Sequence, residues 1–202
     1  VCGHGSEDLL LMSPRTAWQL IWLLCALPLA DLVFRIAAQQ LGANPQEAIL
    51  RATGLWSLTL LLVTLGVTPF RQWLRWPELI PLRRMLGLWA FGYACIHLLA
   101  FWAFEHDFDL AGVAADAFKR PFVTVGLLSF GLMLPMALTS NTAAMRRLGR
   151  GWKRLHRVIY AIALLACVHF FLHRAGKSNF IDPAIASAVV LILLGSRIYF
   201  RR

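Results

Sequence analysis

Long apolar stretches are the feature that most constrains the fold of this chain. A membrane-spanning helix needs about 20 mostly apolar residues, because a helix rises about 1.5 Å per residue and the hydrocarbon core is about 30 Å thick. The chain has six stretches of this kind, approximately over residues 17–38, 48–70, 84–105, 122–140, 155–174 and 183–200. We therefore predict an all-α protein, an integral membrane bundle of six transmembrane helices.

Composition agrees with a membrane protein. Of the 202 residues, 59% are hydrophobic and 15% are charged, whereas soluble domains average about 45–50% apolar and about 25% charged residues. The spans leave too little sequence for a separate soluble domain. Residues 1–13 begin with Val and carry no cleavage pattern, so we expect a remnant of processing or cloning there and place the folded domain at 14–202. No internal repeat or low-complexity segment stands out.

The basic residues predict the orientation of the chain. A net charge of +10 could indicate binding to nucleic acid, but Lys and Arg lie between the spans rather than along one helix face. We therefore expect the chain to contact membrane lipid and to bind no nucleic acid. If the spans alternate, 14 of the 20 basic residues share one side, and seven of the ten acidic residues share the other. The positive-inside rule then places both termini in the cytoplasm of a bacterium, with the spans in its inner membrane.

Two histidines, His97 and His169, lie well inside apolar spans. Ionisable side chains within a membrane are costly and usually have a partner or a function. Each lies 12 to 13 residues beyond a basic residue, Arg84 or Arg157, so both sit roughly 18–20 Å from the same boundary on helices that run in parallel. This matched depth suits bis-histidine ligation of a haem iron. A zinc ion would need further ligands nearby.

The remaining candidate residues lie nearer the ends of the spans. His156 precedes His169 by 13 residues, about 20 Å along a helix, so one haem cannot take both, and His156 belongs to a second, inner site or to none. Arg83, Arg84 and Arg120 are candidates for haem propionate or electron-donor contacts, although they also fit a topological role. Aromatic residues such as Trp152 would line an electron route or simply pack in the core.

These residues resemble the MsrQ family, formerly called YedZ, in the ferric-reductase-like transmembrane superfamily. The resemblance covers about residues 40–200, and it depends on the order and spacing of many short pieces. The matching pieces are Leu41-Gly42-Ala43, Thr53-Gly54, Thr68-Pro69, Arg83-Arg84 with Leu86-Gly87-Leu88-Trp89, His97-Leu98, Arg120-Pro121, Thr139-Ser140, Leu148-Gly149, Trp152, Leu155-His156, Tyr160 and His169.

The resemblance implies a haem b membrane subunit that carries one or two haems on His97, His156 and His169. It would take electrons from the quinone pool or a cytoplasmic flavin reductase and deliver them to MsrP, a periplasmic molybdopterin-containing subunit that reduces methionine sulfoxide. FMN is also associated with the family, but the sequence has no glycine-rich phosphate loop. The wider superfamily usually has a second histidine 13–14 residues before the one on the third span, where this chain has Arg84 and Arg83.

Two other classes of protein remain open on the residues alone. A small transporter would use the buried histidines as a proton relay and would bind no chromophore. A self-contained ferric or oxygen reductase would need a nicotinamide and flavin domain, and the sequence stops two residues after the last predicted span. We therefore expect a partner-dependent electron-transfer subunit rather than a catalytic one.

Overall fold

The computed structural model describes residues 14–75, 79–176 and 180–199, and all regular structure in these ranges is helical. The chain divides after Gln40 into two compact units. The first contains helix α1 (Pro14–Ala37), and the second contains every other described helix. We describe each unit by itself.

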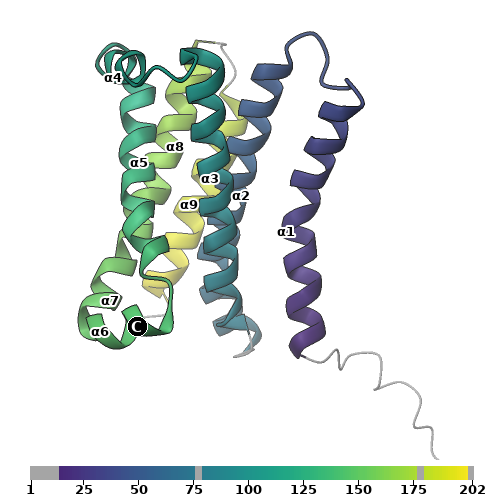
Figure 1. Cartoon of the computed structure of the whole chain (residues 1–202). Helices are drawn as coiled ribbons and strands as arrows, with labels where there is room; N and C mark the ends of the chain where they lie inside the picture. The colour runs from purple at the N-terminus through teal and green to yellow at the C-terminus, as the bar shows by residue number, and fades with distance from the viewer. Residues whose placement is uncertain (1–13, 76–78, 177–179, 200–202) are drawn as a thin grey trace, which may run out of the picture. The chain divides into compact units, whose positions relative to one another are not determined.

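The second unit is built from five long helices and several short ones. The long helices are α2 (Pro45–Leu74), α3 (Leu82–His106), α5 (Pro121–Leu138), α8 (Ile159–Ala175) and α9 (Ile181–Tyr199). The short ones are α4 (Leu110–Lys119), α6 (Thr142–Leu148), α7 (Arg150–Leu155) and the 3₁₀ turn η2 (His156–Val158). The long helices run side by side (Figure 1), as expected for a membrane bundle.

Local sequence explains where these helices begin and end. The Asn44 side chain accepts a hydrogen bond from the Glu47 N–H at 3.2 Å, and Pro45 follows at the first position of α2. Asp109 caps α4 by accepting from two backbone N–H groups, and Pro121 opens α5. Gly149, with φ of +49°, separates α6 from α7, a conformation that costs glycine little.

Five of the described helices are long and apolar enough to cross a membrane. They are Trp18–Ala37, Pro45–Leu74, Leu82–His106, Pro121–Leu138 and Arg150–Ala175, the last of which joins α7, η2 and α8. These spans agree with the first five apolar stretches of the sequence and indicate a multi-pass membrane protein. The predicted count of six is not confirmed, because the 19-residue α9 is not among them. The predicted connectors also contain α4, α6 and α7, which were not expected as helices.

The core of the second unit is narrow, and its outer surface is apolar. Leu65, Ala90 and Ala163 have no exposed surface, and the Ser57 hydroxyl on α2 donates to the Ala90 carbonyl of α3 at 2.9 Å. Small residues at such crossings allow helices to pack closely in a membrane. By contrast, many large apolar side chains on the outside of the unit are exposed, and Ile192 on α9 is 69% exposed. A soluble protein rarely exposes so much apolar surface, whereas a bilayer favours it.

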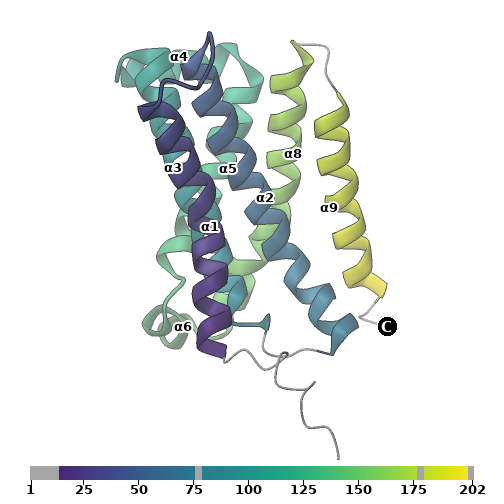
Figure 2. The ribbon, with the colours of Figure 1, turned by 90° about the vertical axis from the view of Figure 1, so that its right-hand side faces the viewer.

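The bundle of the second unit has two distinct ends. At one end α2 finishes, α3 and α8 begin, and α6 and α7 lie nearby; we call this the basic end because it carries Arg71, Arg83, Arg84 and the arginines of α6 and α7. At the opposite end α4 packs against α5 and α3 (Figure 2). The helix pairs α2 with α3 and α5 with α8 make the most extensive contacts in the unit.

Candidate functional site

His97 projects from α3 toward α2 and is held there by a backbone carbonyl. Its Nδ1 lies 2.9 Å from the Leu50 carbonyl oxygen and 3.4 Å from the Thr53 hydroxyl. That hydroxyl lies 2.8 Å from the Ile49 carbonyl oxygen, to which it donates. Because a carbonyl only accepts, Nδ1 of His97 carries the proton, and Nε2 keeps a free lone pair.

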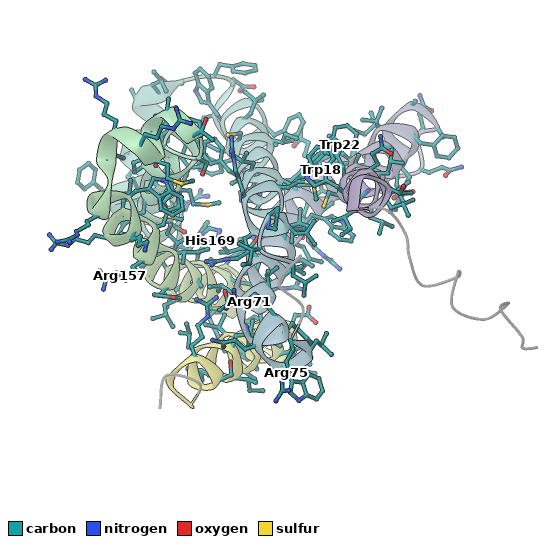
Figure 3. The ribbon with its side chains drawn as sticks, turned by 90° about the horizontal axis from the view of Figure 1, so that it is seen from below. Trp18, Trp22, Arg71, Arg75, Arg157 and His169 are labelled. Atoms are coloured by element: carbon teal, nitrogen blue, oxygen red, sulfur yellow. The ribbon has the colours of Figure 1, made fainter. Side chains whose placement is uncertain are left out.

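His169 is held in the same manner between α8 and α5. Its Nδ1 lies 2.7 Å from the carbonyl oxygen of Phe122, so this nitrogen also donates and Nε2 is again the free one. Seen along the bundle from the basic end, His169 points toward the inside of the bundle (Figure 3). The Phe122 ring lies 6.2 Å from the His169 ring, centroid to centroid.

The two imidazole rings lie next to each other. Their centroids are 6.2 Å apart, and their planes make an angle of 86°. Because α3 and α8 both begin at the basic end, two side chains at similar depth on these helices meet at one level. The juxtaposition expected from the matched spacing of His97 and His169 is thus present.

A glycine on the neighbouring helix makes room for each imidazole ring. A Cβ atom built on Gly54 of α2 would lie 3.0 Å from Cε1 and 3.1 Å from Nδ1 of His97. One built on Gly126 of α5 would lie 2.8 Å from Nδ1 and 2.9 Å from Cε1 of His169. Any side chain at these two positions would push the ring away from its carbonyl partner.

The two histidine positions form an internal repeat that the sequence reading missed. In each half, a histidine donates to a carbonyl on the partner helix, and a glycine lies one helical turn beyond that carbonyl. Every member has its counterpart 72 residues later: Leu50 and Phe122, Gly54 and Gly126, His97 and His169. The signal in the sequence is short, because it consists mainly of Ala94-Cys95-Ile96-His97 and Ala166-Cys167-Val168-His169.

This pair of histidines fits the axial ligands of a haem. Two imidazoles bonded at about 2.0 Å to opposite sides of one metal ion have centroids roughly 6 Å apart, close to the observed 6.2 Å. The orienting carbonyls behave as the outer partners that metal-binding histidines usually have. Within the described residues no cluster of three or more His, Cys, Asp or Glu could hold an ion by itself, so a cofactor that brings its own equatorial ligands suits the site better than zinc.

His156 lies apart from this pair, in the 3₁₀ turn η2 at the basic end. Its Nδ1 is 3.1 Å from the Trp152 carbonyl oxygen, and the Trp152 ring stacks on its imidazole at 3.8 Å. The indole N–H of Trp152 donates to the Thr139 carbonyl at 3.0 Å and anchors α7 on α5. The Nε2 atom of His156 is buried and makes no hydrogen bond of ordinary geometry within the described part of the chain, although the backbone of Met136 on α5 lies close to the ring.

The three predicted arginines occupy different environments. Arg83 is half-buried at the start of α3, within electrostatic range of His156, whereas Arg84 is exposed. Arg120 lies at the opposite end of the bundle, where its Nη1 is 3.4 Å from Asp116 Oδ2. The structure therefore groups only Arg83 with His156, and Arg120 already has an acidic partner.

Two more histidines lie toward the end of the bundle that holds α4. The His173 ring is 6.4 Å from the His169 ring and 5.6 Å from the Phe122 ring. His106 lies with its Nε2 3.2 Å from Asp116 Oδ2. His173 therefore belongs to the surroundings of the histidine pair, whereas His106, the last residue of α3, lies beside α4.

Comparison with known proteins assigns the family. Residues 52–167 match the family model described as "Ferric reductase like transmembrane component". A relative from Polaromonas naphthalenivorans (strain CJ2), named protein-methionine-sulfoxide reductase heme-binding subunit MsrQ, is 46% identical over 89% of this chain and 83% of its own length.

Further relatives carry the same name. The one from Herminiimonas arsenicoxydans is 43% identical over 90% of this chain and 84% of its own length. The one from Caulobacter vibrioides (strain ATCC 19089 / CIP 103742 / CB 15) is 42% identical over 89% of this chain and 85% of its own length. No solved structure matches the chain.

Proposed function

Because the chain belongs to the MsrQ family of ferric-reductase-like transmembrane components, we propose that it is the heme-binding membrane subunit of a protein-methionine-sulfoxide reductase. It would be an electron-transfer subunit, with the reductase chemistry in a partner. The observation that carries this proposal is the pair His97 and His169, whose rings lie 6.2 Å apart with both Nε2 atoms free to bind iron.

Three parts of the chain contribute to haem binding in this proposal. The imidazoles of His97 and His169 would hold the haem iron through their Nε2 atoms. The carbonyls of Leu50 and Phe122 fix the tautomer, so that Nε2 is the unprotonated nitrogen of each ring. The surrounding apolar helices keep water away. Haem b, when bound, supplies an iron that accepts and releases one electron at a time.

His156 is the proposed ligand of a second, inner site, so that the chain holds one or two haems. Three observations support this role: its Nε2 is buried and makes no hydrogen bond of ordinary geometry among the described residues, its ring is fixed by Trp152, and Arg83 lies near it. Arg83 would pair with a propionate there, and the exposed Arg84 would contact the electron donor. Arg120 is a weaker candidate for the same task at the histidine pair, because Asp116 already binds it.

The two ends of the bundle suggest the direction of electron transfer. We propose that α9 is the sixth span and that the basic end faces the cytoplasm of a bacterial inner membrane, as the positive-inside rule predicts. A quinol or a cytoplasmic flavin reductase then donates electrons. The acceptor at the opposite end is the periplasmic molybdopterin-containing subunit MsrP.

Histidine substitutions test the ligand assignment. Replacing His97 or His169 with Ala should remove the same haem, because a haem held from one side loses a strong ligand and its fixed orientation. The variant His156→Ala should keep that haem and slow its reduction by the donor. Haem counted per protein, electron paramagnetic resonance spectra and reduction rates distinguish these outcomes. Loss of different spectral components in His97→Ala and His169→Ala would contradict the pairing.

A further inference from the structure

An apolar groove of about 170 Å³ runs between α8 and α9, outside the histidine site. The groove is lined by side chains that follow one another about one turn apart on each helix, so it runs along the helix axes. Those that matter here are Leu164, Cys167 and Phe171 on α8 and Ser187, Val190 and Leu191 on α9. A membrane protein exposes such a groove to the acyl chains of the bilayer.

The same faces of α8 and α9 carry a polar pair toward the basic end. Tyr160 lies one turn before Leu164 on α8, and Arg197 lies two turns beyond Val190 on α9. The guanidinium Nη1 donates to the Tyr160 hydroxyl at 2.5 Å, and Nη2 donates to the Leu65 carbonyl at 2.7 Å. The guanidinium also lies over the Tyr160 ring, 5.0 Å from its centroid. Arg197 is thus fixed in place by neutral partners.

Positive charge at this point has no acidic counterpart among the described residues. Arg83 lies within electrostatic range of Arg197, Tyr160 and Arg71, with no carboxylate in that set. The described carboxylates of residues 41–202 lie elsewhere, at positions 47 and 182 and between positions 105 and 116. A cluster of guanidinium groups at the level of a membrane surface attracts an anion.

Several donors at this end of the bundle also lack hydrogen-bond partners. The Nε atoms of Arg83 and Arg197 and the hydroxyl of Thr68 are buried, with no partner in the described part of the chain. Thr68 lies on α2 between Leu65, which binds Arg197, and Arg71. Buried polar atoms usually have a partner, so these atoms are a second sign of a missing oxygen-bearing ligand.

We propose that Arg197 and Tyr160, together with the α8–α9 groove, bind one acidic phospholipid. The phosphate pairs with Arg197, and the positive potential of Arg71 and Arg83 supports this contact. One acyl chain lies in the groove, where the helix rises about 17 Å over the twelve residues from Tyr160 to Phe171. The histidine pair His97 and His169 takes no part in this site.

The lipid headgroup and chain can be tested on the unaltered protein. The purified, haem-loaded full chain in neutral detergent is titrated with dioleoyl phosphatidylglycerol, dioleoyl phosphatidylcholine, dihexanoyl phosphatidylglycerol or inorganic phosphate, and thermal unfolding is followed. Long-chain phosphatidylglycerol should raise Tm by roughly 5 °C near saturation, while the other three should raise it much less. An equal effect of phosphatidylcholine would show that the charge is not recognised, and an equal effect of phosphate would show that the groove is unused; either result would overturn the proposal.

Three variants locate the binding site. Arg197→Gln should weaken phosphatidylglycerol binding at least about tenfold, as loss of a charge-assisted contact implies, and Ser187→Phe should weaken it by filling the groove. Arg146→Gln, an exposed charge on α6 at the same end, is the matched control and should bind like the wild type. Native mass spectrometry counts the retained lipid. Wild-type binding by both Arg197→Gln and Ser187→Phe would place the lipid elsewhere and contradict the proposal, and Ser187→Phe alone decides the matter if Arg197→Gln does not fold.

Discussion

At the scale of single residues, two glycines determine whether the histidines can face each other. Gly126 is the tighter case, since a Cβ there would lie 2.8 Å from His169 Nδ1. The variant Gly126→Ala should therefore push the ring away from the Phe122 carbonyl and weaken haem binding about 10–100-fold, the usual effect of disturbing an outer partner of a metal ligand. A haem titration of the haem-free protein, followed by absorbance, measures the change.

Gly131 on the same helix is the matched control. A Cβ at Gly131 meets nothing within 4 Å, and Ala is about 0.8–1 kcal/mol better than Gly inside a helix. Gly131→Ala should therefore bind haem normally and unfold at the same or a slightly higher temperature. If Gly126→Ala behaved like Gly131→Ala, the glycine would not be needed for seating His169.

At the scale of helices, one ion pair joins the end of α8 to the start of α9. Arg174 is only 8% exposed, and its Nη2 lies 2.6 Å from Asp182 Oδ2. Asp182→Asn would leave a buried guanidinium without its counter-charge. Because the Asp182 side chain is half exposed, we expect a loss of about 1–2 kcal/mol, less than for a fully buried pair.

An exposed acidic residue provides the comparison for this ion pair. Asp31 lies 4.0 Å from Arg35 on α1, and both side chains are exposed, so Asp31→Asn should change stability by less than about 0.5 kcal/mol. Thermal unfolding of both variants in the same detergent tests the difference. An equal, small change in the two would mean that the Arg174 pair does not hold α9.

Much of the helical architecture could be predicted, because the lengths of the spans follow from bilayer thickness. Hydropathy located α2, α3, α5 and α8 to within a few residues. It could not reveal α4 or α6, which are too short to span and depend on local caps such as Asp109 and Asn141.

The candidate site was only partly predictable. Equal spacing from basic residues placed His97 and His169 at one depth, and the structure has them side by side. Their carbonyl partners lie 47 residues away in sequence and their glycines 43, and no periodicity within one helix indicates such contacts. The neighbours of His156, Trp152 and Arg83, depend in the same way on which helices meet at the basic end.

At the scale of the whole molecule, charge asymmetry predicts the orientation. With 14 of 20 basic residues on one side, we expect both termini in the cytoplasm. A phosphatase reporter, active only in the periplasm, should be inactive after Arg202 and active when inserted in the 107–109 connection between α3 and α4. The reverse pattern would invert the orientation, while equal activity at both places would contradict an odd number of spans between them.

The central claim is that the chain holds haem between two histidines, and an optical spectrum of the purified protein tests it most directly. The protein is prepared from haem-replete cells, shown to be folded and monodisperse, and measured before and after chemical reduction. We predict a red protein whose reduced-minus-oxidised spectrum has the sharp bands of low-spin b-type haem, with at least one haem per chain. A colourless protein, folded and without these bands, would contradict the claim.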